Sequence, residues 1–150
     1  MTFEDKFTEK QKDMLALSLE YVKRLSSDVE KIYLYASHEN SLYSFNIFYS
    51  ANGEVMTMRK LAILNGVEDI TDLIFNVLKI GTEDIKEVEK ICKKYDRPIP
   101  TQNKKIYVNV KKKVHADYSY ELFYSNSDTL TSNDIFNQWF EEVKAEVEGK

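Results

Sequence analysis

The sequence predicts an α+β fold, an antiparallel sheet of about five strands with helices packed on it, in the order α-βββ-αα-ββ-α. Apolar residues recur with helical spacing at the start, in the middle and at the end of the chain. The segments between them alternate apolar and polar residues, as half-buried strands do. Helices and strands do not alternate at the regular spacing of a parallel βαβ fold, so an antiparallel sheet is expected.

The first sixty residues predict a helix followed by a β-meander. Thr2 and Asp5 have the spacing of a capping box, and the apolar stripe behind them predicts a helix over 3–26. Asn52-Gly53 predicts a tight hairpin, because both residues tolerate positive φ. Three strands rich in Ile, Tyr and Phe are expected here, over residues 31–37, 42–50 and 55–60.

The middle of the chain predicts two helices. An apolar stripe that starts at Ile70 indicates the first helix, and Gly81 interrupts it. Thr82 can cap the second helix, whose first turn would place Glu83 and Asp84 near the positive end of the helix dipole. The Arg-Pro-Ile-Pro segment that follows should end this helix, because proline lacks the N–H group that a helix needs.

A strand pair is expected over residues 104–121, on either side of the three lysines Lys111–Lys113. We expect Ile106 and Val108 on a buried face and Tyr107 on a wet face. The lysines lack the Gly or Asn of a tight hairpin, so a looser turn and one long bent strand both fit the pattern. Ser132 or Asn133 can then cap a last helix, whose apolar stripe includes Trp139, Phe140 and Val143.

Length, charge and cysteine content narrow the class of protein. The 150 residues favour a single domain, residues 1–150. Cys92 is the only cysteine, which fits a reducing compartment, and neither a signal peptide nor an apolar membrane span is visible. We therefore expect a cytoplasmic protein. A net charge of −4 disfavours direct nucleic-acid binding and suits a basic protein partner, although mild acidity also serves solubility alone.

The candidate chemical groups favour structural roles. Cys92 could be a nucleophile with His38 or His115 as its base, but it lies within an apolar helical stripe and is expected to be buried. His115 and Asp117 share a strand face and could begin a metal site, yet further ligands with clear spacing are missing. We expect no catalytic residue, no metal and no cofactor. The lysines at 104, 105 and 111–113 are interpreted as solvated or edge-protecting charges.

Several short motifs resemble the YezG family of bacterial immunity proteins. They are the strand Glu30–Tyr35, the aromatic strand Leu42–Tyr49, the segment Asp117–Glu121 and the start Met1–Glu4, and the resemblance extends over nearly the whole chain. The chain departs from the family pattern where Pro100 is followed by Thr rather than Trp, and where three lysines replace a Gly-containing turn. It would therefore be a divergent member.

The resemblance implies an antitoxin. Proteins of that family are implied to neutralise, inside the producing cell, a toxin exported by a type VII-like secretion system, typically a nuclease with an LXG-type export module. The alternatives are a non-catalytic interaction module, such as an adaptor or chaperone for a secretion substrate, and an enzyme that uses Cys92 or His115. The identity of the partner would discriminate between these classes of protein.

Six acidic side chains are the candidate partner contacts. We expect them to meet a basic surface on the toxin, because Asp117 should lie on a wet strand face and the last helix should turn Glu141 and Glu142 away from its apolar stripe. The exposed aromatic residues of the first two strands, Tyr33, Tyr35 and Tyr43, are the alternative surface. The six acidic candidates are Asp117, Glu121, Asp128, Asp134, Glu141 and Glu142.

Overall fold

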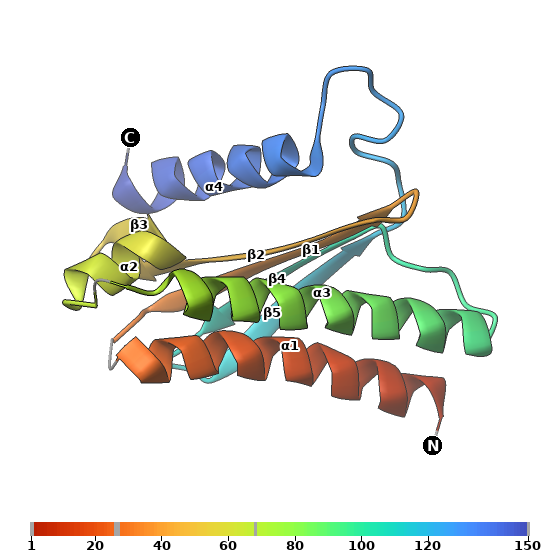
Figure 1. Cartoon of the computed structure of the whole chain (residues 1–150), viewed down its shortest axis with the longest axis horizontal. Helices are drawn as coiled ribbons and strands as arrows, with labels where there is room; N and C mark the ends of the chain where they lie inside the picture. The colour runs from red at the N-terminus through yellow and green to blue at the C-terminus, as the bar shows by residue number, and fades with distance from the viewer. Residues whose placement is uncertain (1, 26–27, 68, 150) are drawn as a thin grey trace.

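The chain folds into three layers, with a five-stranded sheet between helices (Figure 1). The computed structural model describes residues 2–25, 28–67 and 69–149. The strand order is β3-β2-β1-β4-β5 and all neighbouring strands are antiparallel, so the predicted α+β class and element order are confirmed. The elements are α1 (Phe3–Leu25), β1 (Lys31–Glu39), β2 (Leu42–Ala51), β3 (Glu54–Thr57), α2 (Met58–Leu64), α3 (Thr71–Lys94), β4 (Gln102–Val108), β5 (Lys113–Ser119) and α4 (Ser132–Glu148).

The central strand β1 is buried on both faces because helices cover both sides of the sheet. Ile32 and Leu34 face the core beneath α1 and α3, whereas Tyr33 and Tyr35 face α4. The exposure expected for Tyr33 and Tyr35 is therefore wrong. They are 3% and 0% exposed, because α4 packs on the face that a solvated antiparallel sheet would leave open. Tyr43, at the exposed end of β2, stays partly accessible.

Local sequence signals predicted the start of α1 and the β2–β3 turn correctly, but not the cap of α4. The backbone N–H of Asp5 donates to Thr2 Oγ1 and the N–H of Thr2 donates to Asp5 Oδ2, both at 3.2 Å, which is the expected capping box. Asn52 and Gly53 both have positive φ in the β2–β3 turn. The expected helix end at Ser26 lies outside the described residues. The last helix is capped by Thr131 rather than by Ser132 or Asn133, because the Thr131 hydroxyl reaches the N–H of Asp134.

The third strand ends three residues earlier than expected, at Thr57. The Thr57 hydroxyl accepts a hydrogen bond from the N–H of Lys60 at 3.1 Å and thereby caps α2. The segment 58–64, which includes the expected strand end at Lys60, is therefore a helix that the strand assignment missed. Met, Arg, Lys, Leu and Ala are good helix formers, so the cap followed by this composition was the available signal.

Gly81 lies inside one continuous helix, α3, and the expected break into two helices is wrong. A Cβ atom at this position would lie 2.2 Å from Phe45 Cδ2, so glycine is required by close packing against the sheet. Thr82 is not a cap, because its hydroxyl donates back to the carbonyl of Leu78 at 2.9 Å. Glu83 and Asp84 consequently lie in the middle of α3 rather than in a first turn.

Replacing Gly81 with alanine should lower the free energy of unfolding by about 1–3 kcal/mol, although alanine is the better helix former. The added methyl group overlaps the Phe45 ring, which is 3% exposed and has little room to move. Chemical denaturation would measure the change, with Asn76→Ala on the exposed side of α3 as the control. The close-packing explanation is wrong if Phe45→Leu does not recover part of the loss in the double variant.

The strand pair β4–β5 is a hairpin whose turn is formed by residues 109–112, which decides between the two expected geometries. The expected assignment of its faces is wrong for β4. Tyr107 is 9% exposed in the core beneath α1, whereas Ile106 and Val108 lie on the partly covered opposite face and Val110 is 89% exposed in the turn. Helix α1 covers the Tyr107 face of β4, whereas α4 covers the opposite face only in part, and simple alternation could not identify which face a helix would cover.

None of the helices in the described part of the chain has the length and apolar character needed to span a bilayer.

The connection between β5 and α4 positions the candidate site (Figure 1). A long connection, residues 120–131, leaves the edge of the sheet after β5 and arches over to the start of α4.

Candidate functional site

An open groove runs between α4 and the adjoining part of the sheet. α4 packs on β2 and β3, which leaves much of the same sheet face over β4 and β5 uncovered. The groove has a volume of about 200 Å³, and we call it the α4 groove. Its lining residues come from β4, from the connection 120–131 and from α4, and they are Gln102, Lys104, Phe123, Ile135, Gln138, Trp139 and Glu142.

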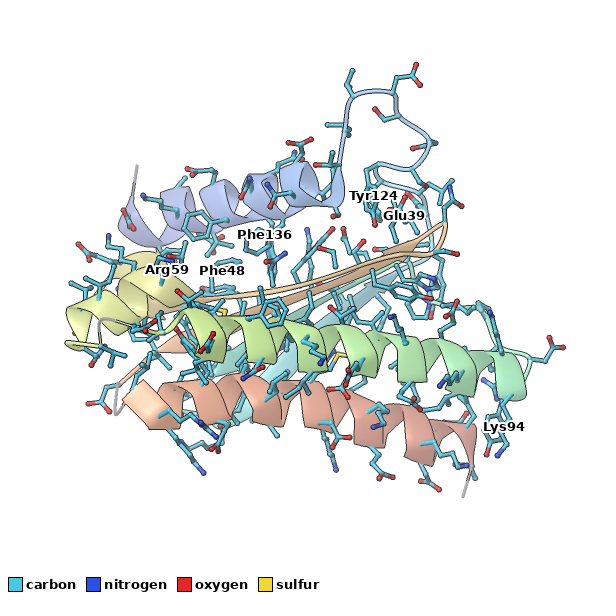
Figure 2. All side chains as sticks on the ribbon, viewed as in Figure 1. Glu39, Phe48, Arg59, Lys94, Tyr124 and Phe136 are labelled. Carbon is cyan, nitrogen blue, oxygen red and sulfur yellow. The ribbon has the colours of Figure 1, made fainter. Side chains whose placement is uncertain are left out.

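An aromatic ring and a lysine side chain form part of the lining of the α4 groove. Trp139 is 7% exposed and packs edge-on against Phe48, with ring centroids 5.1 Å apart. Lys104 Nζ lies 5.1 Å from the Trp139 ring centroid, a cation–π contact. Figure 2 shows how α4 directs Phe136 toward Phe48 on the sheet, which anchors the helix beside the groove.

Acceptor groups lie in the same groove and beside it. Asp117 is directly opposite Lys104 in the β4–β5 register, so both side chains are on the α4 side of the sheet. Glu142 lines the groove from α4 and is exposed. Gln102 Oε1 is buried and has no hydrogen-bond partner among the described residues. These groups can accept hydrogen bonds from a cationic partner side chain.

The structure divides the six candidate partner contacts among three places. Asp117 and Glu142 belong to the side of the α4 groove. Asp134 and Glu141 are separated by seven residues, about two helical turns, and lie on the exposed side of α4. Glu121 and Asp128 are exposed in the connection 120–131.

All six acidic side chains are accessible, but their carboxylates are not equally available to a partner. The Asp134 carboxylate accepts from the backbone N–H of Thr131 at 2.9 Å and closes the capping box of α4. The other five carboxylates make no ion pair within 4 Å in the part of the chain that the structure describes. Asp134 therefore has a structural role that its position in the sequence did not reveal.

Glu39 fastens the connection 120–131 to the end of β1, a role the sequence analysis missed. Its carboxylate is 2% exposed and accepts hydrogen bonds from the N–H groups of Phe123, Tyr124 and Ser125 at 2.9, 3.3 and 3.0 Å. The Ser125 hydroxyl donates a fourth bond at 2.7 Å. Burial alone would raise the pKa of Glu39, but these four donors together lower it below its usual value.

A second bond strengthens the same attachment. The hydroxyl groups of Tyr124 and Ser37 are 2.7 Å apart, and both residues are buried. Figure 2 shows Glu39 and Tyr124 close together where the connection meets the sheet. Glu39 is separated from its partners by more than eighty residues, so only a turn-like segment, 125–128, was visible in the sequence. The attachment fixes the residues that form one end of the α4 groove.

His38 belongs to a second polar cluster, on the other side of the sheet. Its Nε2 atom lies 3.2 Å from Glu89 Oε2, and the Tyr43 hydroxyl donates to Glu89 Oε1 at 2.6 Å. The bond from Tyr43, together with the charges of His38 and Lys93, outweighs burial and lowers the pKa of Glu89. The His38 and Tyr43 rings stack with centroids 4.5 Å apart. This cluster ties the β1–β2 hairpin to α3 and contains no aligned nucleophile.

The other candidate chemical groups are not assembled into a reactive site. Cys92 is 0% exposed, and burial raises the pKa of its thiol, which favours the unreactive protonated form. His115 and Asp117 are both exposed on the edge strand β5. No group of three or more His, Cys, Asp or Glu side chains in the described ranges could hold a metal ion.

A search with protein-family models found no match to this chain, and a search of curated proteins found no similar sequence. The resemblance to the YezG family therefore depends on its four short motifs. In the structure, Glu30–Tyr35 includes the first five residues of the central strand β1, and Leu42–Tyr49 lies in β2. Asp117–Glu121 covers the end of β5 and the start of the connection.

Proposed function

We propose that this protein is an immunity protein that binds and neutralises a secreted nuclease toxin in the cytoplasm of the producing cell, without catalysis of its own. The observation that carries the proposal is the α4 groove, an open surface whose neighbouring carboxylates make no ion pair with the described residues. The sequence motifs that resemble the YezG family support it independently.

The chemistry of this surface suits a basic protein. Nucleases bind a polyanion, so their substrate clefts carry lysine and arginine. Asp117 and Glu142 at the groove, and Glu121 in the connection 120–131, can pair with such residues. The Trp139 ring in the groove can add a cation–π contact if the partner displaces Lys104. The surface needs little reorganisation on binding, because the Glu39 hydrogen bonds already hold the connection 120–131 in place.

Charge reversal in the α4 groove and at the exposed acids around it is expected to slow association. The variant with Lys at positions 117, 121, 141 and 142 replaces four exposed carboxylates that make no ion pair with the residues the structure describes. It leaves out Asp134, because reversal there would also break the capping box. The partner can be captured from lysate of the producing cells and identified by mass spectrometry. We expect the variant to associate at least about tenfold more slowly and with a weaker salt dependence than the parent.

A matched control changes the net charge equally at other places. Glu9, Asp28, Glu54 and Glu83 are exposed and lie outside the α4 groove, so their replacement by Lys also adds eight positive charge units. The association rate of the control should fall less than that of the first variant, because the electrostatic steering of a partner weakens with distance and with salt. Equal rates for the parent and the first variant would exclude this face as the interface.

An interaction module for a secretion substrate is the second candidate function. Ile63 and Leu64 at the end of α2 and Phe75 in α3 are 62%, 61% and 67% exposed, which places them among the most accessible large apolar side chains of the described residues. An adaptor or chaperone would use such residues to hold an apolar segment. If Phe75→Ser abolishes capture of the partner while the four-site charge reversal leaves it unchanged, the adaptor function is favoured over immunity.

A further inference from the structure

Lys105 is a buried lysine on the sheet face opposite the α4 groove. It lies on β4 beneath α1 and is 3% exposed, which is rare for a lysine side chain. No carboxylate within the described residues lies within 4 Å of its Nζ atom. The sequence analysis placed it among solvated or edge-protecting lysines, which is wrong because β4 lies inside the sheet, between β1 and β5.

The hydrogen bonds around Lys105 match a neutral amine. Its Nζ donates to Oε1 of Gln11, from α1, and to Oδ1 of Asn103, its neighbour on the same strand face. The Asn103 side chain is oriented by a bond from its Nδ2 to the carbonyl of Asp117 at 3.1 Å, which turns Oδ1 toward the lysine. A neutral amine has two N–H donors, one for each of these two acceptors.

The electrostatic surroundings favour the same protonation state. Burial without a counter-charge lowers the pKa of Lys105 from 10.5 to about 7. Near neutral pH roughly half of this amine is therefore uncharged, whereas a lysine with an ordinary pKa is almost wholly protonated. An uncharged amine is the form that attacks carbonyl carbon.

A groove of about 200 Å³ leads to Lys105 between α1 and β5, and we call it the α1 groove. Its walls are largely apolar, with Leu15 from α1 and Val114, Ala116 and Tyr118 from β5. The charged or titratable groups that line it besides Lys105 are Lys12 and Tyr118. Burial raises the pKa of Tyr118, so its phenol stays uncharged near neutral pH, and the groove contributes no negative charge.

We propose that Lys105 is a carbonyl-reactive amine that holds a small aldehyde with an apolar body as an imine in the α1 groove. The amine nitrogen forms a bond to the aldehyde carbon, and the carbonyl oxygen takes up a proton. That proton comes from the nitrogen, and the resulting carbinolamine loses its hydroxyl group and the one remaining nitrogen proton as water, to leave a C=N bond. No oxidant or reductant is consumed, and the step is reversible. This site is independent of the proposed partner surface on the opposite face.

Reductive trapping tests this proposal. The intact protein is treated with limiting butanal and sodium cyanoborohydride near pH 7, so that hydride from the reagent converts any imine into a stable secondary amine. Peptide mass spectrometry then locates each butyl group. We expect Lys105 to be labelled at least about tenfold faster than Lys12, which is exposed at the same groove and serves as an internal reference.

Two variants and a pH series complete the test. Lys105→Met should remove the dominant adduct, and Ala116→Leu should slow labelling of Lys105 by narrowing the groove while labelling elsewhere is unchanged. Labelling of Lys105 should level off above about pH 7, where its amine is already largely uncharged. Labelling of Lys105 no faster than that of Lys12 near pH 7, or an unchanged rate in Ala116→Leu, would overturn the proposal.

Discussion

Replacing Trp139 with alanine should lower the free energy of unfolding by about 3–5 kcal/mol. The indole is 7% exposed and packs in the aromatic core between α4 and the sheet. It meets Phe48 and Tyr33 edge-on, with ring centroids 5.1 and 5.9 Å apart. Removal of the ring leaves a cavity against β1 and β2 that the rigid strands can fill only in part. Urea denaturation followed by circular dichroism would measure the loss.

The neighbouring residue supplies the control for this prediction. Gln138 is exposed on the same helix, so Gln138→Ala should change the free energy of unfolding by no more than about 0.5 kcal/mol. A loss below about 1 kcal/mol for Trp139→Ala would mean that the indole contributes little to the core. Its main role would then be in the α4 groove as a partner contact.

Replacing Glu39 with glutamine should destabilise the protein by about 3 kcal/mol near neutral pH. Glutamine has nearly the same shape, but it loses the negative charge that accepts four hydrogen bonds and presents an N–H₂ group to backbone donors. Release of the connection 120–131 should also increase hydrogen exchange at Phe123, Tyr124 and Ser125. Glu121→Gln, two residues away from these donors, should leave that exchange unchanged.

The effect of Glu39 should depend on pH in a defined direction. Its folded-state pKa is lowered from 4.5, so the carboxylate contributes its full stabilisation above the unfolded pKa. This contribution is lost as the pH falls through the folded pKa, where the group becomes protonated in both states. The difference in stability between the parent and Glu39→Gln should therefore be constant from about pH 6 to 8 and shrink below about pH 4.5. A difference that grows on acidification would contradict this account.

The sequence alone was sufficient for features that depend on neighbouring residues. Contacts within a few residues form helix α1, the Asn52-Gly53 hairpin and the capping box of Thr2 and Asp5. Such local contacts produce sequence patterns that can be recognised without the structure. The α+β class also followed from periodicity, because each helix buries one stripe. The burial of Cys92 followed from the same rule.

Features that depend on residues distant in the sequence were decided only by the tertiary structure. Gly81 signalled a break by its low helix propensity, yet the close approach of Phe45 makes glycine necessary inside α3. Likewise, α4 covers a sheet face that strand alternation left open, and this buried Tyr33 and Tyr35.

The candidate sites illustrate the same division. Exposure of all six acidic residues was predictable, because charged side chains off an apolar stripe face water. Their separation into three places, the attachment of Glu39 to residues 123–125 and the burial of Lys105 were not predictable. Each depends on which strand lies at the edge of the sheet and which helix covers it. That arrangement is set by packing across the whole domain, and local sequence patterns carry little information about it.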